Sequence, residues 1–344
     1  MTSTIPKKMK AVVSEELGKP VVIKEVDVPV PGPGEVLVKV AATGVCHTDL
    51  HAIMGDWPVK PKEHLIPGHE GVGTVVAVGP GVEGVEVGDI LGNAWLATAC
   101  GVCEFCRTGR ETLCEAQKNS GYSVDGSYAE YMIVDPKFAA RIPEGVDLNE
   151  IAPILCAGVT VYKALKQTEV KPGQWVVVSG IGGLGHIAVQ YAIAMGMRVA
   201  AVDIDDAKLA LAAEHGAELT VNAKTQDAVA VIQEEIGGSH GVLVTAVNPI
   251  AFSQAMRMTR RGGTIALVGL PPGTFEVDIF DVVLRGLTVR GSIVGTRQDL
   301  QEAVDFYAAG KIHPTVEVED LDAAEAVLKR LEENKIEGRV VLSV

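Results

Sequence analysis

Four of the six cysteines in this 344-residue chain lie within a single short segment. They are Cys100, Cys103, Cys106 and Cys114, and their spacing is C-x2-C-x2-C-x7-C. Such short spacers let one loop wrap a single ion with four thiolates, and a structural zinc ion takes four tetrahedral ligands with Zn–S bonds of about 2.3 Å. The segment is therefore predicted to bind a zinc ion that holds a lobe together and does no chemistry of its own.

Two other uses of the cluster stay open at this point. The bacterial iron–sulfur motif has a shorter last spacer and a following proline, whereas Glu115 follows Cys114 here. Disulfides are rare in the cytosol. The N-terminus has no apolar signal-peptide core, and the longest apolar stretch, 187–197, is too short to span a bilayer. We therefore expect a cytoplasmic protein without membrane contact, in which zinc is the favoured interpretation.

The other two cysteines, Cys46 and Cys156, lie far from the cluster, and His69 lies between them in PGHEGVG (67–73). Two thiolates and one imidazole would leave a zinc ion one open tetrahedral position, as in catalytic zinc sites. Spacing alone does not establish this set, because an isolated cysteine is more often an inert apolar core residue.

The net charge limits the partners of the chain. Lys and Arg number 30 against 44 Asp and Glu, which gives a net charge of −14. Binding to nucleic acid depends on clustered Lys and Arg, so we expect no nucleic-acid partner. The residues are 47% hydrophobic, which is enough for a full core without disulfides.

The residues up to about 150 read as β-rich. Segment 35–45 begins with alternating apolar and charged residues, and 71–91 alternates short valine runs with Gly and Pro turns. Short strands joined by tight turns are typical of a partly open barrel.

From about residue 155, β-branched runs alternate with helical patterns. Helices are predicted at 205–216 and 225–238, each ending in glycine. Six strands are predicted, at 175–180, 197–203, 218–223, 241–247, 263–269 and 287–294. This alternation predicts a doubly wound parallel sheet of the dinucleotide-binding type. The last fifty residues hold two further helical patterns and a strand, which we expect to pack on the first domain.

The motif GIGGLG (180–185) follows the first of these strands and opens a helix. Gly180 would allow the tight turn, Gly182 the approach of a pyrophosphate, and Gly185 close helix–strand packing. Asp203 ends the next strand, where its carboxylate could accept hydrogen bonds from ribose hydroxyls and repel a 2′-phosphate. The pattern favours NAD over NADP, although a strand–turn–helix without a ligand is the alternative.

The chain resembles the zinc-dependent medium-chain alcohol dehydrogenases along its whole length, and most of all their bacterial and yeast-like tetrameric branch. The resemblance rests on the four-cysteine lobe, on GIGGLG, on ILCAGVTVYKAL (154–165) and on the signature G-H-E-x2-G-x5-G-x2-V. That signature is present here as Gly68, His69, Glu70, Gly73, Gly79 and Val82.

The resemblance implies a fold of class α/β, with a GroES-like partly open β-barrel catalytic domain and a six-stranded Rossmann domain. The catalytic domain would comprise 1–155 and 294–344, with the zinc lobe at 95–115, and the NAD-binding domain 156–293. The implied assembly is a homotetramer.

The resemblance also implies two zinc ions per chain. Cys46, His69 and Cys156 would hold the catalytic ion, the Cys₂His set for which alcohol dehydrogenase is itself the reference case. The four clustered cysteines would hold the structural ion. Asp49 would fix the tautomer of His69, and Glu70 would lie near the metal.

The implied reaction is the reversible NAD-dependent oxidation of short primary alcohols to aldehydes, with zinc as Lewis acid and hydride transfer to nicotinamide. The proton would leave through Thr48, the nicotinamide ribose and His51. A solvated surface role is the alternative for His51. The implied cofactor-binding residues are His47, Gly180, Ile181, Gly182, Gly183, Leu184, Gly185, Asp203, Lys208, Val268, Val294 and Arg339.

Trp57 and Trp95 match positions that narrow the substrate pocket in the yeast-like branch, and ordinary core packing is their alternative role. Other functions remain open from sequence. One is a polyol, threonine or formaldehyde dehydrogenase, and Cys156 argues against the polyol branch, in which the motif glutamate can replace a cysteine ligand. Another is a non-catalytic NAD-binding relative, which would lack both metal sets.

Overall fold

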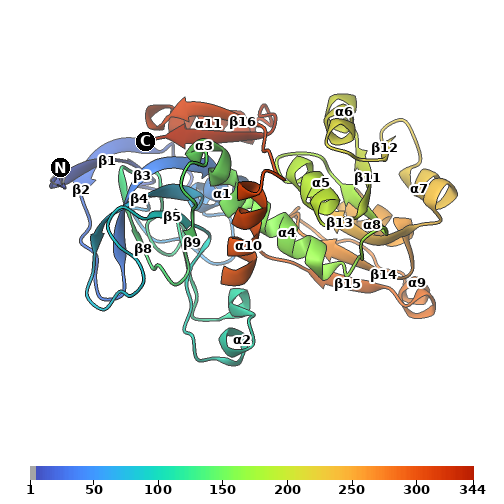
Figure 1. Cartoon of the computed structure of the whole chain (residues 1–344). Helices are drawn as coiled ribbons and strands as arrows, with labels where there is room; N and C mark the ends of the chain where they lie inside the picture. Colours follow the sequence, from blue (N-terminus) through green and yellow to red (C-terminus); the bar gives the residue numbers. More distant parts are fainter. Residues whose placement is uncertain (1–4) are drawn as a thin grey trace. The chain divides into compact units, whose positions relative to one another are not determined.

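The computed structural model describes residues 5–344, which divide into two compact units (Figure 1). The first unit comprises the described residues up to Cys156 together with Gly295–Ala308 and Pro314–Val344. The second comprises Ala157–Val294 and the short segment Ala309–His313. The C-terminal strand β17 (Arg339–Ser343) pairs with β3 (Val36–Val45) of the first unit, so the end of the chain does pack on the N-terminal domain.

The first unit is organised around β3, a strand of 10 residues with three neighbours. Its first half pairs with β8 (Tyr131–Val134) and its second half with β17, while β4 (Gly71–Val78) runs antiparallel along its other edge. One long strand thus belongs to three ladders, two of them on the same edge, which curls the sheet into the partly open barrel that the sequence predicted.

The remaining strands of the first unit are short. The sheet order is β16-β17-β3-β4-β5-β9, and separate two-stranded sheets join β1 with β2 and β6 with β7. Their bounds are β1 Lys8–Val13, β2 Val22–Asp27, β5 Ile90–Asn93, β6 Leu96–Thr98, β7 Lys118–Asn119, β9 Ala140–Arg141 and β16 Val316–Asp320.

The helices of the first unit are mostly short. They are α1 His47–Met54, α2 Glu104–Arg107, η1 Glu111–Leu113, α3 Leu148–Ile151, η2 Ala152–Leu155, α10 Arg297–Ala308, η3 Leu321–Ala323 and α11 Ala324–Glu332. Helices α10 and α11 confirm the two helical patterns predicted near the C-terminus. Helix α11 places Val327, Leu328 and Leu331 in the core that underlies β1 and β17.

The second unit is a six-stranded parallel sheet in the order β12-β11-β10-β13-β14-β15. The strands are β10 Trp175–Ser179, β11 Arg198–Asp203, β12 Leu219–Asn222, β13 Ser239–Val244, β14 Thr259–Leu267 and β15 Thr288–Gly291. The chain continues from β10 to β11 and β12 on one side and then returns to place β13, β14 and β15 on the other side of β10. This change of side is typical of a doubly wound dinucleotide-binding fold. The six predicted strands are thereby confirmed.

Six helices belong to the second unit: α4 Ala157–Gln167, α5 Gly185–Ala194, α6 Asp206–Glu214, α7 Ala228–Ile236, α8 Pro249–Met258 and α9 Ile279–Arg285. The glycine predicted to stop α7 does so, since Gly237 caps it with φ +68°. Among residues 5–344 no single helix combines the length and apolar composition needed to cross a membrane; one bent pair, Leu148–Leu155 with Ala157–Gln167, reaches that threshold by length and composition alone.

Candidate metal centre and dinucleotide site

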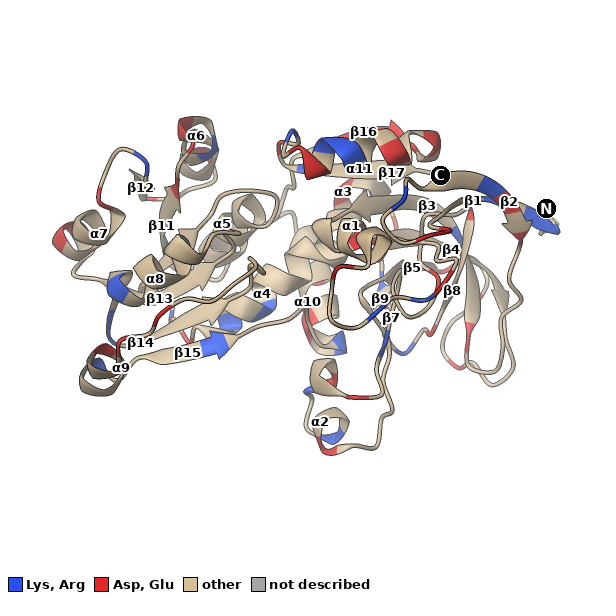
Figure 2. Cartoon of the chain, turned by 180° about the vertical axis from the view of Figure 1, so that it is seen from behind, with Lys and Arg blue, Asp and Glu red and all other residues tan. Residues whose placement is uncertain are grey.

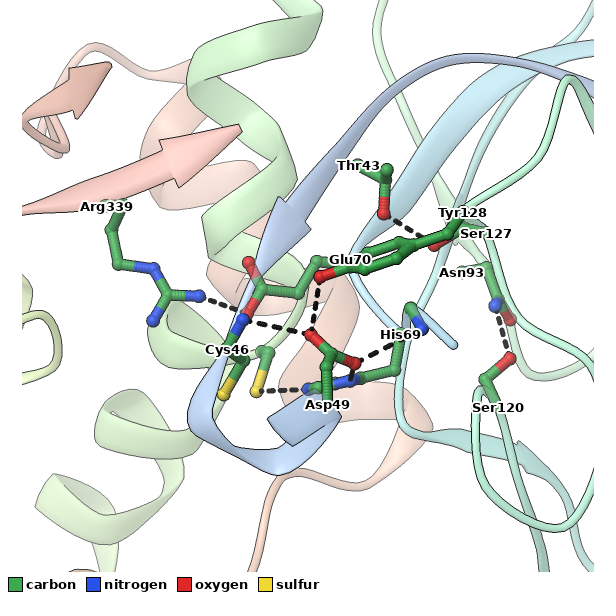
Figure 3. A network of polar contacts seen from close by, with 12 residues as sticks. Thr43, Cys46, Asp49, His69, Glu70, Asn93, Ser120, Ser127, Tyr128 and Arg339 are labelled. Atoms are coloured by element: carbon green, nitrogen blue, oxygen red, sulfur yellow. Dashed lines mark hydrogen bonds and ion pairs between the residues drawn. The ribbon is translucent and has the colours of Figure 1, made fainter. Parts of the chain in front are cut away.

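Three elements of the first unit bring the remote residues of the predicted catalytic site together. Strand β3 ends at Val45, so Cys46 lies at its tip and caps α1. In the antiparallel register Thr43 faces Gly71, which places His69 and Glu70 across from that tip. Cys156 ends η2, which packs against β3. Figure 3 shows Cys46, His69 and Glu70 of this group close to one another.

The four potential ligand atoms of Cys46, His69, Glu70 and Cys156 all lie within 4.8 Å of one another, and all four residues are buried. His69 Nε2 lies 3.2 Å from Cys156 Sγ. A tetrahedral zinc ion with bonds of about 2.0–2.3 Å separates its ligands by roughly 3.5 Å, so these atoms need only small shifts to bind one. Thiolate and imidazole are also the donors that zinc prefers.

An unpaired oxygen supports the same conclusion. Within the described part of the chain, Glu70 Oε2 is buried and has no hydrogen-bond partner. Gly44 makes room for this carboxylate, because a Cβ at Gly44 would lie 1.8 Å from Glu70 Oε2. A buried carboxylate oxygen beside two sulfurs is an environment that a cation would satisfy. The residues therefore fit a zinc ion.

Asp49 orients the imidazole of His69. Its Oδ1 lies 2.8 Å from His69 Nδ1 and also accepts from the Gly68 N–H at 3.2 Å. Its Oδ2 accepts from the Cys46 N–H at 2.9 Å and from the Tyr128 hydroxyl at 3.0 Å. With Nδ1 donating to this carboxylate, the Nε2 lone pair of His69 is directed at the sulfurs, as a zinc ligand requires.

The buried ionisable groups of the site shift one another's pKa values. A hydrogen bond from Cys156 lowers the pKa of the Cys46 thiol well below its usual value, against the effect of burial. Burial lowers the pKa of His69, but the charges and hydrogen bonds of Asp49 and Cys46 together outweigh burial, and the net change is well upward. Burial raises the pKa of Glu70 to about 7, although the Arg339 charge opposes it. A thiolate forms readily here, which favours metal binding.

Arg339, which the family resemblance assigns to cofactor binding, is buried and paired with a carboxylate. It begins β17, where Val340 pairs with Val45, and only 5% of it is exposed. Its Nη2 forms an ion pair with Glu70 Oε1, as Figure 3 shows. Its predicted contact with a cofactor stays a prediction, and the side chain is a structural partner of the metal-site glutamate.

The predicted relay residues follow one another on α1. Thr48 and His51 are three residues apart, so they lie on the same face of the helix, and both are partly exposed. His51 Nδ1 lies 3.0 Å from both carboxylate oxygens of Asp56. Burial lowers the pKa of His47, the first residue of the helix. Asp56 was not predicted, because nothing in GDWP marks it as a histidine partner.

The two tryptophans form an aromatic cluster beside His69. The Trp95 ring meets the His69 ring edge to face at 5.5 Å, and the Trp57 and Trp95 centroids are 5.9 Å apart. Trp57 also stacks on His51 at 5.4 Å. Tyr122, which sequence analysis missed, contacts both indoles at 5.5 and 5.4 Å. The structure thus places Trp95 next to a proposed metal ligand and Trp57 between Trp95 and the proposed relay residue His51.

The four clustered cysteines converge in the lobe that carries α2. Their sulfurs lie within 4.8 Å of one another, and Cys100 Sγ is 3.9 Å from Cys106 Sγ. The Cys103 N–H donates to Cys100 Sγ at 3.3 Å, and such backbone N–H groups lower the pKa of the Cys100 thiol to about 6. The geometry suits a second tetrahedral ion. Glu111 ties the lobe to α10 through Arg297 at 3.0 Å.

The second unit holds the predicted dinucleotide residues other than His47 and Arg339, which belong to the first unit. Gly180 follows β10 with φ +95°, and a Cβ there would lie 2.6 Å from the Ala246 nitrogen. A Cβ on Gly185 would lie 1.9 Å from the Gly180 oxygen, whereas Gly182 faces open space. The loop therefore has the tight turn, the close helix packing and the open backbone that a pyrophosphate requires.

Asp203 is held at the end of β11. Its Oδ2 accepts from the Ile181 N–H at 2.6 Å and its Oδ1 from the Ile204 N–H at 2.7 Å. The carboxylate is thus fixed beside the glycine-rich loop. Lys208 lies on α6, and Val268 and Val294 follow β14 and β15, so the last two share the carboxyl edge of the sheet with Gly180.

Comparison with known proteins matches both units. Residues 32–144 match the alcohol dehydrogenase GroES-like domain, and residues 183–309 match the zinc-binding dehydrogenase family. An alcohol dehydrogenase of Moraxella sp. (strain TAE123) is 61% identical over 97% of this chain and 99% of its own length. An alcohol dehydrogenase of Rhizobium meliloti (strain 1021) is 58% identical over 98% and 99%.

Solved structures of alcohol dehydrogenases share the fold of this chain. The crystal structure of the alcohol dehydrogenase from the archaeon Aeropyrum pernix superposes with a TM-score of 0.89 at 34% identity, covering 97% of this chain and 100% of that one. The relatives favour an alcohol dehydrogenase over the polyol, threonine, formaldehyde and non-catalytic alternatives. The chain therefore belongs to the zinc-dependent medium-chain alcohol dehydrogenase family.

Proposed function

We propose that this alcohol dehydrogenase uses NAD to oxidise short primary alcohols reversibly, with one catalytic and one structural zinc ion per chain. The observation that carries the proposal is the convergence of Cys46, His69 and Cys156. Steady-state kinetics test it, with a series of primary and secondary alcohols and with NAD and NADP as alternative cofactors. We expect ethanol or a close homologue with NAD to give the highest kcat/KM, and a preference for secondary alcohols or for NADP would contradict the proposal.

Each residue near the metal has a distinct proposed task. Zinc held by Cys46, His69 and Cys156 supplies a Lewis acid that makes an alcohol hydroxyl more acidic. Asp49 keeps the His69 ring in the tautomer that binds metal. Thr48 accepts the hydroxyl proton and passes it toward His51. Glu70 balances the charge of Arg339 behind the site.

Replacing His51 with glutamine should slow alcohol oxidation mainly at low pH. The imidazole hands the proton to water, and at high pH hydroxide can take it without this help. We expect kcat/KM below neutrality to fall by about tenfold to a hundredfold, with little change at pH 9 or above. The pH dependence of kcat/KM measures this. An unchanged profile would remove His51 from the relay.

Replacing Asp203 with alanine should relax the preference for NAD. The carboxylate would repel the 2′-phosphate of NADP, and a bidentate acceptor for the ribose hydroxyls is lost with it. We expect the ratio of kcat/KM for NAD over NADP to fall by about tenfold or more, because hydrogen bonds to charged groups contribute about 1.5–3 kcal/mol. Asp205→Ala is the matched control, since that residue caps α6.

Replacing Trp57 with alanine should shift the substrate range. Two indoles beside His69 leave little room for long chains, and removal of one opens the site. We expect kcat/KM for hexanol relative to ethanol to rise by about tenfold, which corresponds to the burial of roughly two further methylenes at about 0.8 kcal/mol each. If the ratio stays constant, the indole has only a packing role.

A homotetramer is proposed as the assembly, and an apolar face on α9 supports association. Phe280 is 75% exposed and Ile279 is 76% exposed, and Val283 and Leu284 extend the same short helix. Strand β15 beside it is an edge of the sheet. A second copy of the chain could cover this apolar surface. Light scattering on the zinc-loaded protein measures the mass of the assembly.

We also propose a cytoplasmic location.

A further inference from the structure

A hollow of about 560 Å³ lies on the second unit, where α8 ends and β14 begins. Its charged lining consists of four arginines and one carboxylate, namely Arg257, Arg260, Arg261, Arg285 and Asp281. Figure 2 shows basic residues gathered where these two elements join. The chain as a whole has a net charge of −14, whereas the four guanidinium groups around this hollow make the local charge positive.

Two of these arginines are fixed by the backbone. Arg285 donates to the Thr259 carbonyl and pairs with Asp281 at 3.3 Å, and only 18% of its side chain is exposed. Arg261 Nη1 donates to the Leu284 carbonyl at 2.7 Å. Both groups are therefore held in place without a ligand, which reduces the entropy lost when an anion binds.

The other two arginines have donors to spare. Across residues 5–344, no hydrogen bond or ion pair engages the Arg257 guanidinium, and Arg260 Nη1 contacts only His240 Nε2, at 2.8 Å. Burial and the Arg260 charge lower the pKa of His240, so the neutral ring accepts this hydrogen bond. Since Asp281 is already paired with Arg285, three positive charges around the hollow have no carboxylate partner in the described part of the chain.

The hollow is distinct from the predicted dinucleotide site. Strand β14 starts at Thr259, so Arg260 and Arg261 lie at the amino edge of the parallel sheet. Gly180 follows the carboxyl end of β10, at the opposite edge. A strand of five residues separates the two edges by roughly 16 Å. The pyrophosphate of a dinucleotide on GIGGLG therefore does not reach these arginines.

We propose that this hollow binds a compact phosphate polyanion, either inorganic pyrophosphate or the diphosphate of a free nucleotide. The planar fork of a guanidinium matches phosphate oxygens in pairs, and several arginines around one concave surface favour a multiply charged ligand over a single carboxylate. The site is separate from the metal centre and from the glycine-rich loop, so it does not depend on the proposed reaction.

Calorimetric titration of the zinc-loaded, full-length protein with pyrophosphate tests the proposal. NAD is kept saturating so that the glycine-rich loop is filled, and the zinc content is measured before and after, because pyrophosphate binds zinc. The test variant is R257Q/R260Q, which leaves the backbone contacts of Arg261 and Arg285 intact. The matched control is R198Q/R330Q, which removes the same charge at two arginines outside the hollow, paired with Glu218 and Glu317.

We expect saturable binding of pyrophosphate to the unmodified protein and to the control, and binding at least about tenfold weaker in R257Q/R260Q. A parallel titration with ADP identifies the source: tighter binding of ADP assigns the hollow to a nucleotide, and tighter binding of pyrophosphate assigns it to the inorganic anion. Absence of saturable binding by either anion, or equal weakening in both variants, would overturn the proposal.

Discussion

Replacing Cys46 with alanine is expected to lower kcat/KM for alcohol oxidation by about a thousandfold or more. Zinc as a Lewis acid contributes several kcal/mol of transition-state stabilisation, and each 1.36 kcal/mol corresponds to about tenfold in rate. With one thiolate gone, His69 and Cys156 hold the ion weakly. Elemental analysis of the variant should find one zinc ion per chain in place of the two proposed for the unmodified protein.

The matched control is the replacement of Cys103, in the four-cysteine lobe, with alanine. This variant should also bind one zinc ion fewer, but its loss should appear first as a lower midpoint of thermal unfolding, because a structural zinc ion contributes to folding. If Cys46→Ala keeps normal activity, or if the two cysteine variants behave alike, the division into a catalytic and a structural site is wrong.

Replacing Asp49 with alanine should have the second largest effect. Its carboxylate is fully buried and accepts from four donors, the N–H groups of Cys46 and Gly68, His69 Nδ1 and the Tyr128 hydroxyl. Each buried donor left unsatisfied costs about 1–3 kcal/mol, so we expect the free energy of unfolding to fall by about 3 kcal/mol or more. Zinc affinity should fall by about tenfold to a hundredfold, since His69 is no longer oriented.

Denaturant unfolding and competition with a zinc chelator measure these two changes. Asp147→Ala is the control, because Asp147 is a carboxylate that caps α3 and touches no metal ligand. Its loss should cost about 1 kcal/mol and leave zinc affinity unchanged. Equal zinc affinity in Asp49→Ala and the unmodified protein would show that the His69 ring needs no partner.

Local patterns allowed the most secure predictions from sequence. The four cysteines of the lobe lie within one loop, so their spacing alone predicts a shared ion, and their sulfurs do converge. The strand–GIGGLG–helix unit is equally local, and Gly180 and Gly185 have the conformations and contacts that the motif requires. Six strands were predictable because buried parallel strands are nearly continuous apolar runs.

The proposed catalytic set depends on pairing between distant strands, which periodicity does not reveal. Cys46, His69 and Cys156 meet because β3 and β4 pair in one particular register and η2 packs on β3. The resemblance to a known family supplied these residues, and spacing did not. Tyr128 and Asp56 were missed because a hydrogen-bond partner carries no sequence signal of its own.

Arg339 illustrates the same limit. The sequence placed it in a short C-terminal strand, and its role came from resemblance alone. The register of β17 against β3, with Val340 opposite Val45, sets its guanidinium beside Glu70 in the interior. A charged residue in the EGRVV segment gives no indication that it is 5% exposed and paired with a glutamate 269 residues away.

An anomalous difference map from crystals of the purified protein, with data collected on both sides of the zinc absorption edge, tests the central claim most directly. We predict two zinc peaks per chain, one bonded to Cys46 Sγ, His69 Nε2 and Cys156 Sγ at about 2.0–2.3 Å, and one among the four cysteines of the lobe. A map with the lobe peak alone, in protein that oxidises alcohols at full rate, would contradict the account.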